Sequence, residues 1–229
     1  PHRLCYDDER CENARRRKDE IHRMIKNIVF DIGNVLAGFV WQDFYRSFGY
    51  SEEIFEKLAN ATVKSPMWNE MDRGAMSDEE LLLSFIRNDP SIERELLRVF
   101  ENVRGMVRRY DYAIPWIREL KEKGLGIYII SNFARKAHKE CADALDFLEE
   151  VDGAILSYQV KLIKPDPEIY RLLCRNYGLE ASECVFIDDT AKNVEAARAE
   201  GMAGIVFHTL EQAQGELAAM LCGGCFDGN

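Results

Sequence analysis

Short apolar segments alternate with amphipathic segments along most of this chain. Ile25 to Phe30 predicts a first strand, and four later apolar segments predict strands at 126–131, 151–157, 184–188 and 203–208. Helical spacing predicts helices between them, at 134–149, 166–177, 191–200 and 210–221. Apolar strands that alternate with helices are typical of a parallel sheet covered on both faces. We therefore expect an α/β fold with a Rossmann-like parallel sheet core flanked by helices.

One long segment interrupts this alternation after the first strand. Residues 41–110 look entirely helical, and Ser77-Asp78-Glu79-Glu80 before three leucines is a capping-box pattern. We expect a core domain formed by residues 24–40 and 111–221, with a small helical domain, 41–110, inserted into it. The charged residues 1–23 are interpreted as an extension without function rather than a basic binding arm, and the Gly-rich residues 222–229 as a flexible tail.

Composition excludes several classes of partner. The 229 residues carry a formal net charge of -10, whereas a duplex-binding surface needs concentrated Lys and Arg, so no nucleic-acid partner is expected. No apolar run approaches the roughly 20 residues that span a bilayer, so no membrane partner is expected either. The 7 scattered cysteines and the lack of an apolar leader favour a reduced, cytoplasmic protein. A monomer and a homodimer both remain open.

Polar side chains gather where the predicted strands end. Ligands bind beyond the carboxyl ends of parallel strands, which makes these positions the candidate site. Asp31 supplies a carboxylate, and Ser131-Asn132 supply a hydroxyl and an amide. Lys164 supplies an ammonium group, and Asp188-Asp189 form an acidic pair. A carboxylate can attack phosphorus, clustered carboxylates select Mg²⁺, and hydroxyl and ammonium groups stabilise phosphoryl oxygens. The set therefore indicates phosphoryl transfer.

Four motifs in order resemble those of the haloacid dehalogenase superfamily. They are Phe30-Asp31-Ile32-Gly33-Asn34-Val35-Leu36, Ile129-Ile130-Ser131-Asn132, Ile163-Lys164-Pro165-Asp166-Pro167 and Val185-Phe186-Ile187-Asp188-Asp189-Thr190 with Asn193. The helical insert lies at the cap position of the subgroup that holds small-molecule phosphatases and true dehalogenases. The Asp-x-Gly-Asn-Val start and Asp72-Arg73-Gly74 resemble bacterial α-D-glucose-1-phosphate phosphatases and, more distantly, the N-terminal phosphatase domain of soluble epoxide hydrolases.

This resemblance implies a role for each motif residue. Asp31 would be the nucleophile, and Lys164 would neutralise the charges of Asp31 and the phosphate together. Ser131 would be a third catalytic residue, which holds the phosphate. The Mg²⁺ ligands would be Asp31, the Gly33 carbonyl, Asp189 and Asp188. The phosphate would contact Ser131, Asn132, Lys164, Gly33 and Asn34. In the cap, Arg73 is a candidate for substrate contact, whereas Trp68 and Met71 are expected to pack the insert.

One position departs from the family's pattern. Most phosphatases of this superfamily have a second Asp two residues after the nucleophile, as general acid and base, but this chain has Gly33 there. A general acid typically contributes about 10²–10⁴-fold to the rate. Asp43 or Asp72 could reach the site from the cap, a question that only geometry decides.

Three functions remain in competition. The first is a Mg²⁺-dependent phosphatase that hydrolyses a small-molecule phosphate ester through an aspartyl-phosphate intermediate, with sugar phosphates as one candidate substrate. The second is a non-catalytic phosphate- or metabolite-binding relative, which Gly33 would favour. The third is a 2-haloacid dehalogenase, which the acidic pair Asp188-Asp189 disfavours because that chemistry needs no Mg²⁺.

Overall fold

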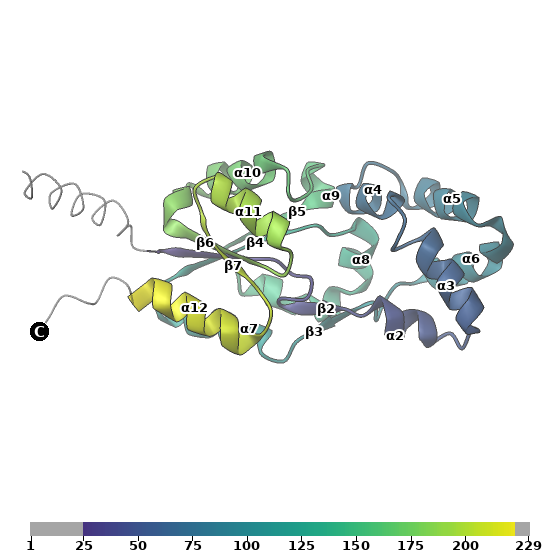
Figure 1. The fold of residues 1–229 in the computed structure, drawn as a ribbon, viewed down its shortest axis with the longest axis horizontal. Helices are drawn as coiled ribbons and strands as arrows, with labels where there is room; N and C mark the ends of the chain where they lie inside the picture. Colours follow the sequence, from purple (N-terminus) through teal and green to yellow (C-terminus); the bar gives the residue numbers. More distant parts are fainter. Residues whose placement is uncertain (1–24, 223–229) are drawn as a thin grey trace, which may run out of the picture.

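A five-stranded parallel sheet with the strand order β5-β4-β1-β6-β7 forms the centre of the molecule (Figure 1). Its strands are β1 (Asn27–Phe30), β4 (Gly126–Ser131), β5 (Gly153–Leu156), β6 (Cys184–Asp188) and β7 (Ala203–Val206). This computed structural model describes residues 25–222. The predicted extension, and the predicted tail beyond residue 222, lie outside the described residues. From β1 the chain adds strands first on the β4 side and then on the β6 side, which creates a crevice at the carboxyl end of β1.

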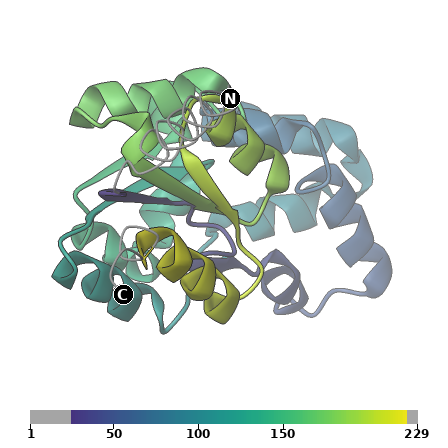
Figure 2. The same cartoon turned by 60° about the vertical axis from the view of Figure 1, so that its left-hand side comes forward.

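Helices cover both faces of the sheet. α7 (Ala113–Glu122) and α12 (Leu210–Cys222) lie on one face, and α10 (Pro167–Tyr177) and α11 (Ala191–Ala199) lie on the other (Figures 1 and 2). Successive strand residues point to opposite faces. Ile28 and Phe30 of β1 accordingly pack in the core on the α7 side, and Val29 packs with α10 and α11. The expected α/β class is confirmed.

The segment that follows β1 forms a helical cap beside the sheet, at the end where β1 finishes (Figure 1). Its helices are α2 (Trp41–Arg46), α3 (Glu52–Ala61), α4 (Met67–Arg73), α5 (Asp78–Asn88) and α6 (Glu93–Glu101). Buried side chains such as Leu58, Phe85 and Leu96 give the cap a hydrophobic core of its own. The capping box at Ser77 and Glu80 is confirmed. Within the described residues, none of the helices has the length and hydrophobicity that crossing a membrane requires.

Two short strands join the cap to the core. β2 (Ala37–Phe39) leads into the cap and β3 (Val107–Arg109) leads out, and they pair antiparallel with Phe39 opposite Val107. The expectation that 41–110 is entirely helical is therefore wrong at its end. Three-residue strands are too short to show an alternating pattern in the sequence.

The helix expected at 134–149 is also shorter than predicted. α8 covers Arg135–Glu140, two 3₁₀ turns follow at Ala142–Ala144 and Asp146–Glu149, and a single α-turn, α9 (Ser157–Val160), comes after β5. The Glu140 carboxylate accepts a hydrogen bond from the Val103 N–H, and the Cys141 thiol donates to the Val103 carbonyl. These contacts fix the end of α8 against the segment that returns from the cap.

Candidate active site

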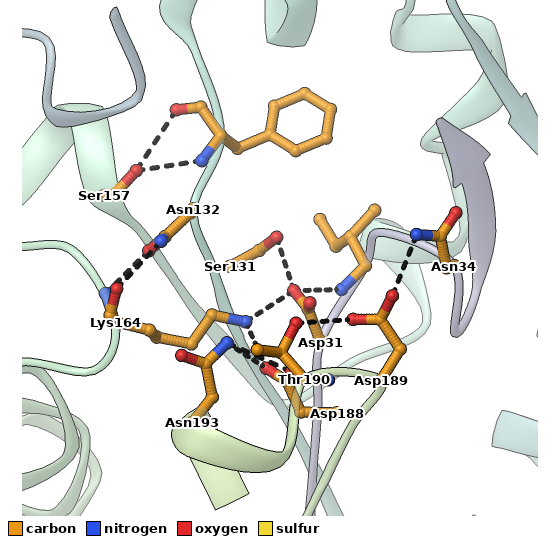
Figure 3. Close-up of polar contacts among 12 residues, drawn as sticks. Asp31, Asn34, Ser131, Asn132, Ser157, Lys164, Asp188, Asp189, Thr190 and Asn193 are labelled. Carbon is orange, nitrogen blue, oxygen red and sulfur yellow. Dashed lines mark hydrogen bonds and ion pairs between the residues drawn. The ribbon is translucent and has the colours of Figure 1, made fainter. Parts of the chain in front are cut away.

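Asp31 lies directly after β1, in the crevice between β4 and β6 (Figure 3). Its Oδ1 atom accepts hydrogen bonds from the Ser131 hydroxyl and from the Ile32 backbone N–H, both at 2.7 Å. The same atom lies 2.7 Å from the Lys164 ammonium nitrogen. Among the described residues, Oδ2 has no hydrogen-bond partner. The carboxylate is therefore held in one orientation with one oxygen left for chemistry.

Lys164 lies between two carboxylates. Its Nζ atom is 2.6 Å from Asp188 Oδ2 as well as 2.7 Å from Asp31 Oδ1, and the residue is 3% exposed. Burial alone would lower the pKa of this ammonium group, but the charges of Asp31 and Asp188 outweigh that effect and raise the pKa. The backbone of Lys164 is fixed by Asn132, whose Oδ1 accepts from the Lys164 N–H and whose Nδ2 donates to the Lys164 carbonyl (Figure 3).

The acidic pair at the end of β6 divides into two environments. Asp188 is fully buried and accepts hydrogen bonds from the Thr190 N–H at 2.8 Å and from Asn193 Nδ2 at 3.1 Å. Asp189 is partly exposed and accepts a 2.9 Å bond from Asn34 Nδ2. Asn34 has a left-handed backbone with φ 55°, a conformation that Asn tolerates better than most residues. This turn brings its side chain to Asp189.

Three carboxylates at this point form a donor set that fits a divalent cation. One oxygen each from Asp31, Asp188 and Asp189 lies within 4.8 Å of the other two. Burial raises the pKa of Asp31 to about 6, and the nearby Asp188 charge adds to that effect against Lys164. A single ammonium group leaves this cluster with excess negative charge, and hard oxygen ligands select Mg²⁺. The chemistry of the site therefore supports a metal held by these carboxylates.

A cavity of about 130 Å³ opens between this crevice and the cap. Its wall is mostly apolar and includes Trp68 and Met71, which were expected only to pack the insert. The remaining apolar lining consists of Phe39, Phe100, Val103, Met106, Val107, Phe133, Ala134 and Ala137. The other lining residues are Gly33 and the polar residues Asp72, Asn132 and Lys136.

The structure brings some predicted site residues together and leaves one aside. Those that converge around the crevice are Asp31, Ser131, Lys164, Asp188 and Asp189. The side chains of Asn132 and Asn34, expected at the phosphate, are engaged with Lys164 and Asp189. Arg73, expected at the substrate, lies 3.5 Å from Glu70 and is not part of the cavity lining.

Ser157 makes a contact between the cap and the core that the sequence did not predict. The buried Ser157 hydroxyl accepts a hydrogen bond from the Phe133 N–H at 2.8 Å and donates to the Asp72 carbonyl at 2.5 Å. It thus ties the loop after Ser131 to the end of α4. The sequence carries no signal for this link, because 85 residues separate Ser157 from Asp72.

A parallel sheet with three carboxylates and a buried lysine at its crevice, and with a helical cap beside that crevice, defines a capped, Rossmann-like α/β fold. The chain matches the family model of the haloacid dehalogenase-like hydrolases over residues 25–201. It therefore belongs to this family, as its four motifs indicate.

Relatives of named function match much of the chain at low identity. The sesquiterpene phosphatase astK of Aspergillus oryzae is 25% identical over 79% of this chain and 88% of its own length. The phosphorylated carbohydrates phosphatase of Thermotoga maritima is 26% identical over 73% and 82%. The drimenol cyclase drtB of Aspergillus calidoustus is 24% identical over 85% of this chain, which spans 36% of that longer protein.

Solved structures share the fold. A family enzyme from Bacteroides thetaiotaomicron, in complex with magnesium and inorganic phosphate, superposes with a TM-score of 0.65 at 20% identity. The match covers 82% of this chain and 98% of that one. At this identity the likeness shows a shared fold.

Proposed function

We propose that this protein is a Mg²⁺-dependent phosphatase that hydrolyses small-molecule phosphate esters with Asp31 as the nucleophile. The observation that carries the proposal is the state of Asp31: Oδ1 is held by Ser131 and Lys164, and Oδ2 is without a partner among the described residues. A carboxylate oriented in this way can attack phosphorus and form an aspartyl-phosphate. Water then hydrolyses this intermediate.

The residues around Asp31 would stabilise the charge that develops during transfer. Lys164 carries a positive charge beside the nucleophile, and the Ser131 hydroxyl can turn from Asp31 to a phosphoryl oxygen. Asn132 keeps Lys164 in place through both of its backbone groups. Mg²⁺, held by Asp31, Asp188 and Asp189, would offset the repulsion between the anionic ester and the carboxylates.

The two alternatives have less support. A non-catalytic binding protein would not need a nucleophile oriented by three donors, yet Asp31 has this arrangement. A haloacid dehalogenase attacks carbon without a metal, and a cluster of three carboxylates beside the attacking group would serve no purpose there. Phosphatases among the relatives, astK and the Thermotoga protein, also support phosphate ester hydrolysis.

The cavity wall bears on the substrate. A sugar phosphate was one expectation, but sugar hydroxyls need partners, and the Asn132 side chain is engaged with Lys164 while Lys136 lies 2.6 Å from Glu140. Buried polar groups without partners cost about 1–3 kcal/mol each. An apolar cavity of about 150 Å³ binds benzene, and this one has about 130 Å³. We therefore propose an ester whose alcohol part is largely apolar, which also agrees with the sesquiterpene phosphatase relative.

The function is tested by hydrolysis of a panel of phosphate esters, including p-nitrophenyl phosphate, with and without Mg²⁺. Wild type and Asp31→Asn are compared. We expect phosphate release that requires Mg²⁺ and falls by at least about 10³-fold in the variant, because an amide is a poor nucleophile. Binding of Mg²⁺ and phosphate without turnover of any ester would instead favour the non-catalytic relative.

A further inference from the structure

We propose that Asp72, supplied by the cap, is the general acid and base of the reaction, in place of the carboxylate that Gly33 lacks. This inference rests on the proposed phosphatase function. It concerns the leaving group, which departs as an alkoxide unless a proton reaches it. The argument combines the position of α4, the cavity wall and the room around Gly33.

The end of α4 is fixed to the core at Asp72 itself. The Asp72 carbonyl accepts a 2.5 Å hydrogen bond from Ser157, and the Gly74 carbonyl accepts one from the Lys161 ammonium group. Gly74 has φ 63° and packs so closely on Tyr158 that an added Cβ would lie 2.9 Å from the Tyr158 carbonyl oxygen. The backbone that carries the Asp72 carboxyl group is thus held at the mouth of the crevice.

Few groups in the cavity can donate a proton. Of its described lining residues, only Asp72 and Lys136 have titratable side chains, and Lys136 lies 2.6 Å from Glu140. Asp43, the other acidic candidate, is exposed on α2 and absent from the lining. Lys164 and Asp188 are occupied with each other, 2.6 Å apart. Asp72 is the remaining acid in the lining of the cavity.

The electrostatic environment suits this role. Burial, assisted by the charge of Asp31 and opposed by Lys164, raises the pKa of Asp72 to about 7. A carboxyl group of this kind is partly protonated near neutral pH. It can give up a proton in one step and take it back in the next.

The reaction is balanced with this single proton. Asp31 forms a bond to phosphorus as the bond from phosphorus to the ester oxygen breaks, and that oxygen takes the Asp72 proton and leaves as the alcohol. The Asp72 carboxylate then takes a proton from water while the water oxygen attacks phosphorus. The bond to Asp31 breaks, which releases inorganic phosphate and restores both side chains.

The test compares two leaving groups, because p-nitrophenolate leaves without a proton and an alkoxide does not. In the presence of Mg²⁺, we expect Asp72→Asn to lower kcat/KM for cyclohexylmethyl phosphate by about 100-fold or more, and for p-nitrophenyl phosphate by less than about tenfold. Asp43→Asn is the matched control on the cap surface, with both values unchanged.

A second variant returns a carboxylate to the core. A Cβ at Gly33 would meet no heavy atom within 4 Å, and Gly33 is not among the glycines with positive φ. We expect Gly33→Asp, added to Asp72→Asn, to raise kcat/KM on the alkyl ester at least about tenfold above that of Asp72→Asn alone. A merely structural role of Asp72 would not allow this rescue.

The outcomes separate the two proposals. Equal losses on both esters in Asp72→Asn, or no loss on either, would overturn the role of Asp72 while Asp31-dependent turnover still supports the phosphatase. Wild type without any Mg²⁺-dependent turnover would overturn both. A leaving-group-dependent loss together with rescue by Gly33→Asp supports both.

Discussion

At the scale of single residues, the site is defined by an imbalance of charge. Lys164 is 3% exposed and faces Asp31 and Asp188, while Asp189 adds a third carboxylate within 4.8 Å of the others. Buried charges are costly unless they are paired, so this cluster destabilises the metal-free protein. A cation that binds the folded state alone relieves the repulsion and stabilises the fold.

Added Mg²⁺ should therefore raise the melting temperature. At about 100 times its Kd, a ligand of the native state contributes about 2.7 kcal/mol, or roughly 5–10 °C for a chain of this size. We expect Asp189→Asn to lose most of this shift, because Asp189 is the partly exposed carboxylate of the three. Thermal melts of wild type and Asp189→Asn, with and without MgCl₂, measure this shift in melting temperature. An undiminished shift in Asp189→Asn, equal to that in Asp43→Asn, would contradict the metal site.

At the scale of elements, the docking of α4 on α9 fixes the position of Asp72 relative to the catalytic site. Gly74→Ala should disturb it in two ways, through the left-handed φ of 63° and through the contact of the new Cβ with Tyr158. Gly49→Ala is the matched control, since Gly49 has φ 71° and no heavy atom within 4 Å of an added Cβ. Both changes should cost about 1 kcal/mol in backbone strain.

The two variants should differ in activity. We expect Gly74→Ala to lower kcat/KM by at least about tenfold, because a shift of about 1 Å in a catalytic group can cost about 10²-fold. Gly49→Ala should retain wild-type kcat/KM, although backbone strain lowers its melting temperature. Steady-state kinetics on one ester, with melts of both proteins, provide the comparison. Equal kcat/KM in the two variants would show that the docking contact has no influence on catalysis.

Elements were predictable where local signals agreed with the final packing. α10 begins and ends as expected, with Asp166 as N-cap, Pro167 in the first turn and Gly178 in the left-handed C-cap. The helix expected at 134–149 breaks after Glu140, since contacts to Val103 hold its end. Local periodicity does not include such tertiary contacts.

At the scale of the whole molecule, cap and core together shape the cavity and hence the preference among esters. Cyclohexylmethyl phosphate and glucose 6-phosphate both have a six-membered ring and a primary leaving group, and they differ in the ring oxygen and hydroxyls. We expect kcat/KM to be at least about tenfold higher for the cyclohexyl ester, because the wall leaves hydroxyls unpaired. Met71→Gln should narrow this ratio, whereas Met220→Gln, exposed on α12, should not. A preference for the sugar ester would contradict the apolar substrate class.

The core part of the site was predictable because parallel strands end at one edge of the sheet. Asp31, Ser131 and Asp188 follow or end three neighbouring strands, so their convergence could be expected from the order of elements. The contribution of the cap could not. Asp72 lines the cavity because contacts of α4 with Ser157 and Lys161, far along the chain, hold it there.

The paired strands β2 and β3 make the cap a separate module of the molecule. Phe39 and Val107 lie opposite each other, so the chain enters and leaves the cap at one point. The cap also has a separate hydrophobic core. To the sheet, everything from 40 to 106 is then equivalent to a long hairpin loop, and loops of such length are entropically tolerable. The cap can thus diversify in evolution, or be exchanged in a chimera, as a unit that changes selectivity and the residue at the Asp72 position, while the carboxylates and the lysine of the core are retained.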